Sequence, residues 1–164
     1  MIELPIITPD GEFLARYSSQ GLCGLKFPSP AGQPSTPSGS VEMSETVCRW
    51  QEQTVNALTL ALKGKPPHEL PPLDLSKGTE FQQSVWQAMS RIACGRTSSY
   101  AQIAAAIGRP KAVRAVGRAC GANPIPVLIP CHRVLAAHNE LGGFSGGLEW
   151  KRLLLKREAV LLLE

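Results

Sequence analysis

The chain has 164 residues, of which 43% are hydrophobic and 18% are charged, a composition typical of a globular protein with a sizeable core. No apolar run reaches the roughly 18 residues that a membrane-spanning helix needs, so the sequence predicts no membrane span. Glu3 stands where a signal peptide would carry basic residues, and no long apolar stretch follows it. We therefore expect a soluble protein of the cytoplasm, or of the nucleus if the host is a eukaryote.

The cysteines show neither a disulfide framework nor a zinc motif. Their number is odd and no two form a C-x-x-C pair: they are Cys23, Cys48, Cys94, Cys120 and Cys131. The three histidines add no zinc-finger spacing to them. We expect reduced thiols and no bound metal.

Positive charge is concentrated in the second half of the chain. Residues 1–77 hold six Lys or Arg and eight Asp or Glu, a net charge of −2. Residues 78–164 hold eleven Lys or Arg and five Asp or Glu, a net charge of +6. This asymmetry favours a polyanionic partner for the second half, although a basic face that meets only solvent would have the same composition.

The sequence predicts two domains, over residues 1–76 and 77–164. A Pro-rich connection, residues 66–75, precedes the boundary. Within the first domain, residues 28–40 are rich in Pro, Ser and Gly, and we expect a flexible surface loop there.

The rest of the first domain is predicted to be a small α/β unit. Residues 12–17 and 22–27 read as two strands around the turn at residues 18–21, which indicates a hairpin. From about residue 45 to residue 63, apolar side chains recur near helical spacing, so we expect a helix there.

The second domain is predicted to be mostly helical. Thr79 with Gln82, and Ser99 with Gln102, form two capping boxes, and each predicts the start of a helix. A third helix is expected from Pro110 to about residue 120, because the missing N–H of a proline costs nothing in a first helical turn.

The second and third of these helices have the pattern of a helix-turn-helix. Lys111, Arg114 and Arg118 lie on the outer side of the third helix, opposite its apolar face. In a helix-turn-helix the second helix meets DNA, so these side chains are candidate DNA contacts. An ordinary helical hairpin would show the same spacing.

A proline-rich segment leads to the candidate nucleophile, Cys131. Its prolines exclude a helix, and we expect residues 127–129 to form a short buried extended segment. Cys131 then lies beside His132 and Arg133. A thiol attacks as the thiolate, and we expect the neighbouring imidazole and cationic groups to lower its pKa. His132 can face Cys131 directly only if the backbone turns there; otherwise a water would bridge them. For the other four cysteines we expect small, inert apolar side chains.

A glycine-rich loop, residues 141–147, follows and leads into a helix over residues 148–158. Such a loop lets backbone N–H groups approach a ligand closely, although most loops of this kind are only turns. Glu158 closes the helix, where a carboxylate is unfavourable to the helix dipole. It is either part of a surface ion pair or an acid that orients His132.

Residues 129–134, Ile-Pro-Cys-His-Arg-Val, resemble the active-site signature of the O6-alkylguanine-DNA alkyltransferases, the suicide DNA-repair methyltransferases. The resemblance covers about residues 79–158 in the right order. Its further motifs are Ser99-Tyr100, residues 109–117, Asn123-Pro124, Ser145-Gly146-Gly147 and Glu158. Several spaced motifs make it much more specific than the hexapeptide alone. The first third of the chain matches only as Gly21-Leu22 followed by a strand.

The resemblance implies an α/β protein: a small ribonuclease-H-like N-terminal α/β domain and a mostly helical, winged-helix-like C-terminal domain with the helix-turn-helix. It implies single-turnover transfer of the alkyl group from O6-alkylguanine, and from O4-alkylthymine, in double-stranded DNA. The damaged base would be flipped through the minor groove. No cofactor is needed because the damaged base is the alkyl donor, and we expect a monomer.

For the reaction itself, the resemblance implies that Cys131 takes the alkyl group and that His132 acts as the base through a water. Glu158 would hold the tautomer of His132. Tyr100 would help to rotate the phosphate and would hydrogen-bond the departing guanine.

The resemblance also implies a base pocket and a DNA-contacting surface. Asn123 would tie the helix-turn-helix to the active-site loop, and Arg114 would fill the gap that the flipped guanine leaves. The expected substrate-binding residues are Asn123, Val134, Phe144, Ser145 and Gly146. The expected DNA-binding residues are Tyr100, Lys111, Arg114, Arg118 and Arg133.

One residue departs from the family pattern: Phe144 stands where many relatives have Tyr, so any role for a hydroxyl group is lost. Two other readings stay open, a helix-turn-helix regulator in which Cys131 is structural and a Cys-His hydrolase. The helix-turn-helix pattern favours the regulator over the hydrolase, and the glycine-rich loop beside Cys-His favours an enzyme over the regulator. Stoichiometric loss of activity separates transfer from hydrolysis.

Overall fold

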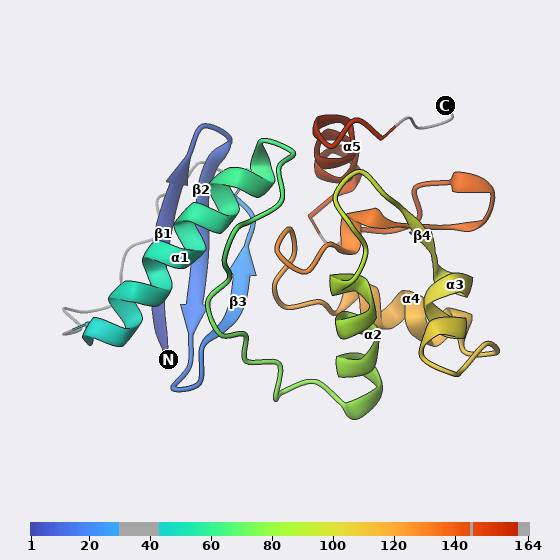
Figure 1. Ribbon diagram of the computed structural model, residues 1–164, viewed down its shortest axis with the longest axis horizontal. Helices are drawn as coiled ribbons and strands as arrows, with labels where there is room; N and C mark the ends of the chain where they lie inside the picture. Colours follow the sequence, from blue (N-terminus) through green and yellow to red (C-terminus); the bar gives the residue numbers. More distant parts are fainter. Residues whose placement is uncertain (30–42, 145, 161–164) are drawn as a thin grey trace.

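The computed structural model describes residues 1–29, 43–144 and 146–160, and its mixed α/β architecture confirms the predicted fold class (Figure 1). The described elements, in chain order, are β1 (Ile2–Thr8), β2 (Gly11–Tyr17), β3 (Leu22–Lys26), α1 (Glu45–Leu62), α2 (Glu80–Ser90), β4 (Ser98–Ser99), α3 (Tyr100–Ala106), α4 (Val113–Gly121), the 3-10 turn η1 (Cys131–Arg133), β5 (Val134–Leu135), the 3-10 turn η2 (Ala137–Asn139) and α5 (Leu148–Arg157). None of these helices has the length and apolarity needed to cross a membrane.

The N-terminal half is an antiparallel sheet, ordered β1-β2-β3, with α1 lying along it (Figure 1). The predicted hairpin is confirmed as β2 and β3, and the predicted helix as α1. Strand β1 was not predicted, because Pro5 interrupts its sequence and its burial does not alternate. Its place at the edge of the sheet tolerates the missing N–H of Pro5.

The loop predicted over residues 28–40 falls almost entirely outside the described residues. The domain boundary predicted near residue 76 lies in the connection between α1 and α2, and it stays a prediction.

The C-terminal half contains the predicted helices, and both capping boxes are confirmed. Thr79 and Gln82 exchange side-chain to backbone hydrogen bonds at the start of α2, and Ser99 and Gln102 do so at the start of α3. The prediction that the third helix begins at Pro110 is wrong. α4 begins three residues later, because the preceding residues form a turn that is closed by a hydrogen bond from Ala112 N–H to the Arg109 carbonyl (2.9 Å).

The approach to Cys131 is buried as predicted, but it is not extended. Val127 has a φ of 73°, and the Ile129 N–H donates to the Ile125 carbonyl (2.9 Å), so residues 125–129 form a tight turn. A positive φ is strained for a β-branched residue, and nothing in the local sequence signals it.

The two halves share one continuous hydrophobic core. The Leu25 N–H of β3 donates to the Pro124 carbonyl (2.9 Å), so the sheet is joined directly to the turn that precedes Cys131. Phe13 and Phe27 from the N-terminal half also pack against Trp150 of α5, with ring centroids 5.6 and 5.0 Å away. The C-terminal half is therefore built against the sheet.

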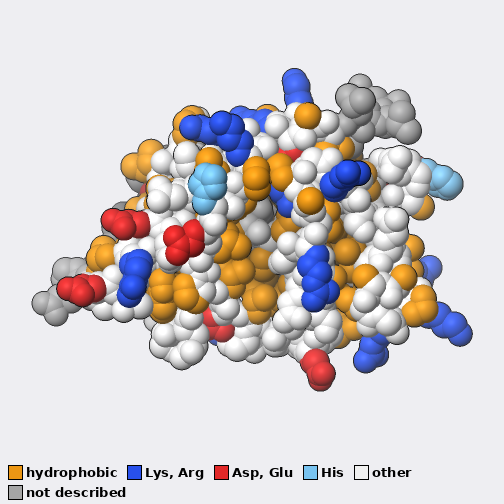
Figure 2. All heavy atoms as spheres, in the orientation of Figure 1, with side chains coloured by type: hydrophobic (Ala, Val, Ile, Leu, Met, Phe, Trp, Pro, Cys, Tyr) orange, Lys and Arg blue, Asp and Glu red, His pale blue; other side chains and the backbone are white. Residues whose placement is uncertain are grey.

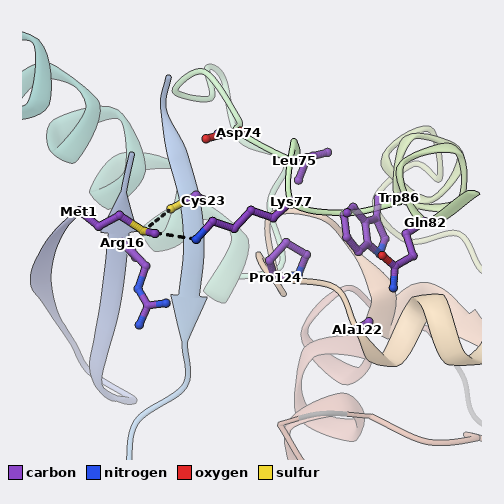
Figure 3. Close-up of a pocket in the computed structure, with 11 residues that line it drawn as sticks. Met1, Arg16, Cys23, Asp74, Leu75, Lys77, Gln82, Trp86, Ala122 and Pro124 are labelled. Carbon is purple, nitrogen blue, oxygen red and sulfur yellow. Dashed lines mark hydrogen bonds between the residues drawn. The ribbon is translucent and has the colours of Figure 1, made fainter. Parts of the chain in front are cut away.

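A cavity of about 280 Å³ remains between the sheet and α2 (Figure 3). Cys23 and Lys77 both point toward the Met1 sulfur within it, and Trp86 lines its far side. Among the described residues, none of those expected to act on substrate or to contact DNA lines this cavity, so it is separate from them.

Candidate active site

The 3-10 turn η1 presents Cys131 at the end of the buried approach. The Cys131 N–H donates to the Ile129 carbonyl (2.8 Å) and the Arg133 N–H to the Pro130 carbonyl (3.0 Å), so the backbone turns at Cys131 and His132. Cys131 is 5% exposed. A reacting group can therefore reach the Cys131 thiol only by entering the protein.

Asn123 fixes the tight turn that leads to the thiol. It follows the end of α4, and its side-chain amide donates to the Ile129 carbonyl (2.9 Å) and accepts from the Ile125 N–H (3.0 Å). A further hydrogen bond from this side chain reaches the Cys131 thiol. Asn123 thus connects the second helix of the helix-turn-helix to the nucleophile.

His132 and Glu158 form a buried pair. His132 Nε2 lies 2.9 Å from Glu158 Oε1, and the two side chains are 1% and 3% exposed. Among the described residues, His132 Nδ1 is buried without a hydrogen-bond partner. Glu158 also forms an ion pair with Arg133 (2.8 Å), so the ion pair that was one alternative for Glu158 exists, but it is internal rather than at the surface.

The charges of this pair define the tautomer of His132. Burial by itself would raise the pKa of Glu158, but hydrogen bonds from His132 and Arg133 lower that pKa to about 2. Burial also lowers the pKa of His132, so its ring is neutral near pH 7. An ionised carboxylate accepts only, so His132 donates through Nε2 and keeps the basic lone pair on Nδ1.

Arg133 points into the protein. It is therefore not placed for the DNA contact that the sequence suggested. Its guanidinium donates to both carboxylate oxygens of Glu158 (2.8 and 3.0 Å) and to the Ile92 carbonyl (2.7 Å). Its side chain is 11% exposed. These three hydrogen bonds are all intramolecular, and we propose that Arg133 positions Glu158 instead.

The pKa of the Cys131 thiol is not lowered overall, in contrast to the prediction. Burial raises this pKa, while the hydrogen bond from Asn123 and the charge of Lys151 offset part of the rise. Neighbouring groups act in the expected direction, but desolvation of the thiolate outweighs them. Cys131 therefore rests as the protonated thiol, which would need a base before it could act as a nucleophile.

Lys151 is a buried residue of the site that the sequence reading missed. It lies on α5 and is 0% exposed. Its ammonium group donates to the backbone carbonyls of Val134, Leu141 and Gly143. The signal was available, because Leu154 and Leu155 follow at helical spacing and place Lys151 on the buried face of the helix.

Tyr100 and the glycine-rich loop lie together near the thiol. Tyr100 is the first residue of α3, and the Gly143 N–H donates to its hydroxyl group. A Cβ at Gly142 would stand 2.7 Å from that hydroxyl, so only glycine allows the approach.

The remaining expected pocket residues belong to the same loop and to strand β5. Val134 is fully buried in β5, which pairs with β4. Phe144 makes an edge contact with Phe27 (ring centroids 5.6 Å apart), and a Cβ at Gly146 would clash with the Phe27 ring. Ser145 lies outside the described residues.

The other three basic side chains predicted to meet DNA, Lys111, Arg114 and Arg118, are exposed. Arg114 and Arg118 lie on α4, and Lys111 lies in the turn before it. Figure 2 shows Lys and Arg side chains projecting from the edge of the molecule where α3 and α4 lie in Figure 1. Val116, Ala119 and Cys120 form the buried face of α4, and Val113 is partly buried against the core.

Comparisons with known proteins agree on one family. Residues 80–160 match the family described as 6-O-methylguanine DNA methyltransferase, DNA binding domain. The methylated-DNA–protein-cysteine methyltransferase of Salmonella typhimurium is 52% identical over 86 residues, which are 52% of this chain and 50% of that protein. The bifunctional transcriptional activator/DNA repair enzyme Ada of Escherichia coli is 56% identical over 88 residues, 54% of this chain and 25% of Ada. These matches thus span half or less of the relatives' length.

A solved structure extends the similarity to the N-terminal half. The Mycobacterium tuberculosis OGT in complex with DNA is 34% identical with a TM-score of 0.74, and the match covers 94% of this chain and 90% of that one. The likeness therefore includes the sheet and α1 as well as the helices around Cys131. The chain belongs to the O6-methylguanine-DNA methyltransferase family.

Proposed function

We propose that this protein repairs alkylated DNA by moving the alkyl group from O6 of guanine to Cys131, once per protein molecule. The observation that carries the proposal is the buried arrangement of Cys131, the unpartnered Nδ1 of His132 and the ionised Glu158. It supplies a nucleophile, a base and a group that holds the base in its working tautomer.

The chemical step starts from the protonated thiol. The Cys131 proton passes to His132 Nδ1 through a water, and Glu158 stabilises the imidazolium that forms. The sulfur then forms a bond to the alkyl carbon while the bond between that carbon and O6 breaks. The electron pair of the broken bond leaves with the guanine. A hydrogen bond from the Tyr100 hydroxyl stabilises the departing base. The thioether has no easy leaving group, so each molecule acts once.

The buried thiol requires the damaged base to leave the DNA stack. Because Cys131 is 5% exposed, no base inside a duplex reaches it. Flipping through the minor groove delivers the base, and extrusion costs least for a base that pairs poorly. O4-alkylthymine presents an alkyl group on the same kind of exocyclic oxygen and is a second substrate of the proposal.

The walls of the base pocket have separate tasks in this proposal. The carbonyls of Cys131 and Val134 read the amino group of guanine, Ser145 faces O6, and Phe144 with Gly146 lines the alkyl group. Lys111, Arg114 and Arg118 hold the duplex, and Arg114 fills the space that the base leaves. The protein acts on DNA in the cytoplasm, or in the nucleus of a eukaryotic host.

Intact-protein mass spectrometry after mixing with duplex DNA that holds one O6-methylguanine tests the proposal. We expect a gain of one methyl group, mapped to Cys131 by peptide analysis, and no further repair by the spent protein. Cys131→Ser is the matched control, and it should bind the alkylated duplex without gaining mass.

Two results would overturn the proposal. Repaired DNA with unmodified, still active protein would indicate a hydrolase. Tight binding of the wild-type protein to alkylated DNA with no transfer would indicate a binding module.

A further inference from the structure

Lys151 is a fully buried cation with no assigned role in the proposed chemistry. Its side chain is 0% exposed, whereas the neighbouring Arg152 and the later Lys156 of α5 are exposed. Holding an ammonium group away from water is costly unless hydrogen bonds and nearby charges offset the loss of hydration. The groups around Lys151 therefore indicate what it does.

The ammonium group joins two segments that flank the thiol. It donates to the Val134 carbonyl (2.7 Å) directly after η1, and to the carbonyls of Leu141 and Gly143 (3.4 Å for Gly143) in the glycine-rich loop. These carbonyls bear no formal charge. Lys151 thus fixes the strand after Cys131 relative to the loop.

The same loop also contacts Tyr100. The Gly143 carbonyl accepts from Lys151, while the Gly143 N–H donates to the Tyr100 hydroxyl. Gly143 therefore connects Lys151 to Tyr100, the residue proposed to stabilise the departing guanine.

The titratable groups that face Lys151 are thiols and an imidazole. Cys131 of η1 and Cys120 of α4 both favour its charged form, but burial dominates and lowers the pKa of Lys151 to about 8. In return, the charge of Lys151 lowers the pKa values of Cys131 and Cys120, and it disfavours protonation of His132. Burial raises the pKa of Cys120 to about 12 and also raises the pKa of Cys131, which is the thiol of the proposed reaction.

We infer that Lys151 is a positioning residue for the alkyl transfer, holding Val134 and the 141–143 loop in register and facing the Cys131 thiolate with its positive charge. The inference rests on the proposed function for its role in repair. The coupling between Lys151 and Cys131 is testable without DNA.

Alkylation of Cys131 by iodoacetamide, followed by peptide-resolved mass spectrometry from pH 6 to pH 10, measures the coupling. Lys151→Met keeps the length of the side chain and removes the charge. We expect alkylation of Lys151→Met to be about tenfold slower than that of wild type near pH 7, where Lys151 is charged, and nearly equal at pH 10, where wild-type Lys151 has lost its charge. Lys156→Met, an exposed change on the same helix, should leave the profile unchanged.

The transfer rate from O6-methylguanine duplex gives the second readout. Lys151→Met should slow transfer at least tenfold at pH 7, and the ratio to wild type should shrink above pH 8, where Lys151 itself loses its charge. Profiles that run parallel at every pH would show a purely structural role and would overturn the inference.

A titration of the folded wild-type protein decides the question if Lys151→Met does not fold. Carbon-13 NMR of protein labelled at the lysine Cε should show Lys151 titrating near pH 8. At high pH the Cys131 thiolate forms and favours the charged lysine, so the wild-type titration curve should extend to higher pH than the curve of Cys131→Ser. Identical curves would mean that the two groups are not coupled. If wild-type protein takes no methyl group from DNA but these titrations behave as expected, the proposed function fails and the coupling stands.

Discussion

Arg157 and Asp10 form a bidentate ion pair between the two halves of the molecule, with N···O distances of 2.7 and 2.8 Å. Asp10 lies in the turn between β1 and β2, and Arg157 is the last residue of α5. The same guanidinium donates to the Leu62 carbonyl at the end of α1 (2.8 Å). Since Glu158 follows directly, the N-terminal half anchors the point of α5 that supports His132.

Asp10→Asn should therefore weaken both stability and the anchoring of Glu158. We expect a loss of about 1 kcal/mol of unfolding free energy, since the pair is partly exposed, and a transfer rate slower by a few fold. Urea unfolding and single-turnover kinetics measure the two effects. Glu52→Gln, an exposed change on α1, is the control.

The pH dependence of this loss has a defined sign. The hydrogen bond from Arg157 holds the pKa of Asp10 below its ordinary value of 3.8. The stabilisation is thus present above pH 3.8 and declines as the pH falls further. A difference between Asp10→Asn and wild type that persists unchanged in strong acid would mean that the ion pair is not its source.

His132 and Glu158 should matter most where the thiol is protonated. His132→Phe or Glu158→Gln should slow transfer at pH 7 by about 10²–10⁴-fold, as for loss of a general base, and by less at high pH, where the thiolate forms unaided. Single-turnover rates from pH 6 to pH 10 test this. Equal slowing throughout would indicate that the pair is structural and would remove the relay from the mechanism.

Glu158 should also make the fold sensitive to acid. Its pKa is held at about 2, below the ordinary value of 4.5, by His132 and Arg133. Its stabilisation is complete above pH 4.5 and is lost as the pH falls toward 2. Wild type should exceed Glu158→Gln by about 2–3 kcal/mol in urea unfolding at pH 6 and by clearly less at pH 3. A constant difference would contradict the assignment.

The features that were predictable from the sequence are local ones. The capping boxes that begin at Thr79 and Ser99 are four-residue motifs, and each one specifies the start of a helix. The hairpin follows from its two strands and the turn between them. The motif around Cys131 identifies the nucleophile by resemblance, because its neighbours in sequence are also its neighbours in the site.

The features that escaped prediction depend on contacts between distant segments. The left-handed conformation of Val127 is held by the surrounding turn and core, and β1 is a strand because β2 pairs with it. Arg133 points inward because Glu158, 25 residues later, is there to bind it. Local propensity carries no information about such partners, so the direction of a side chain is learned only from the fold.

Arg114 is the residue for which two roles make different kinetic predictions. It lies exposed on α4 between Lys111 and Arg118 along the chain, away from the buried face of the helix. If all three side chains only contact phosphates, changing any one to Ala should weaken DNA binding comparably and reduce the salt slope by about one unit. A side chain that fills the gap left by the flipped base acts instead on the extrusion of that base.

Repair rates on two substrates separate these roles. Extrusion is costly for a paired base and cheap in a single strand, so Arg114→Ala should slow repair of paired O6-methylguanine far more than repair of the single-stranded base. Lys111→Ala and Arg118→Ala should slow both substrates alike, because a phosphate contact is made with either. The three variants are compared at one salt concentration, so that phosphate screening is constant. Equal duplex-to-single-strand ratios across them would leave Arg114 as one more phosphate contact, and the space of the flipped base would then need another occupant from the same face of α4.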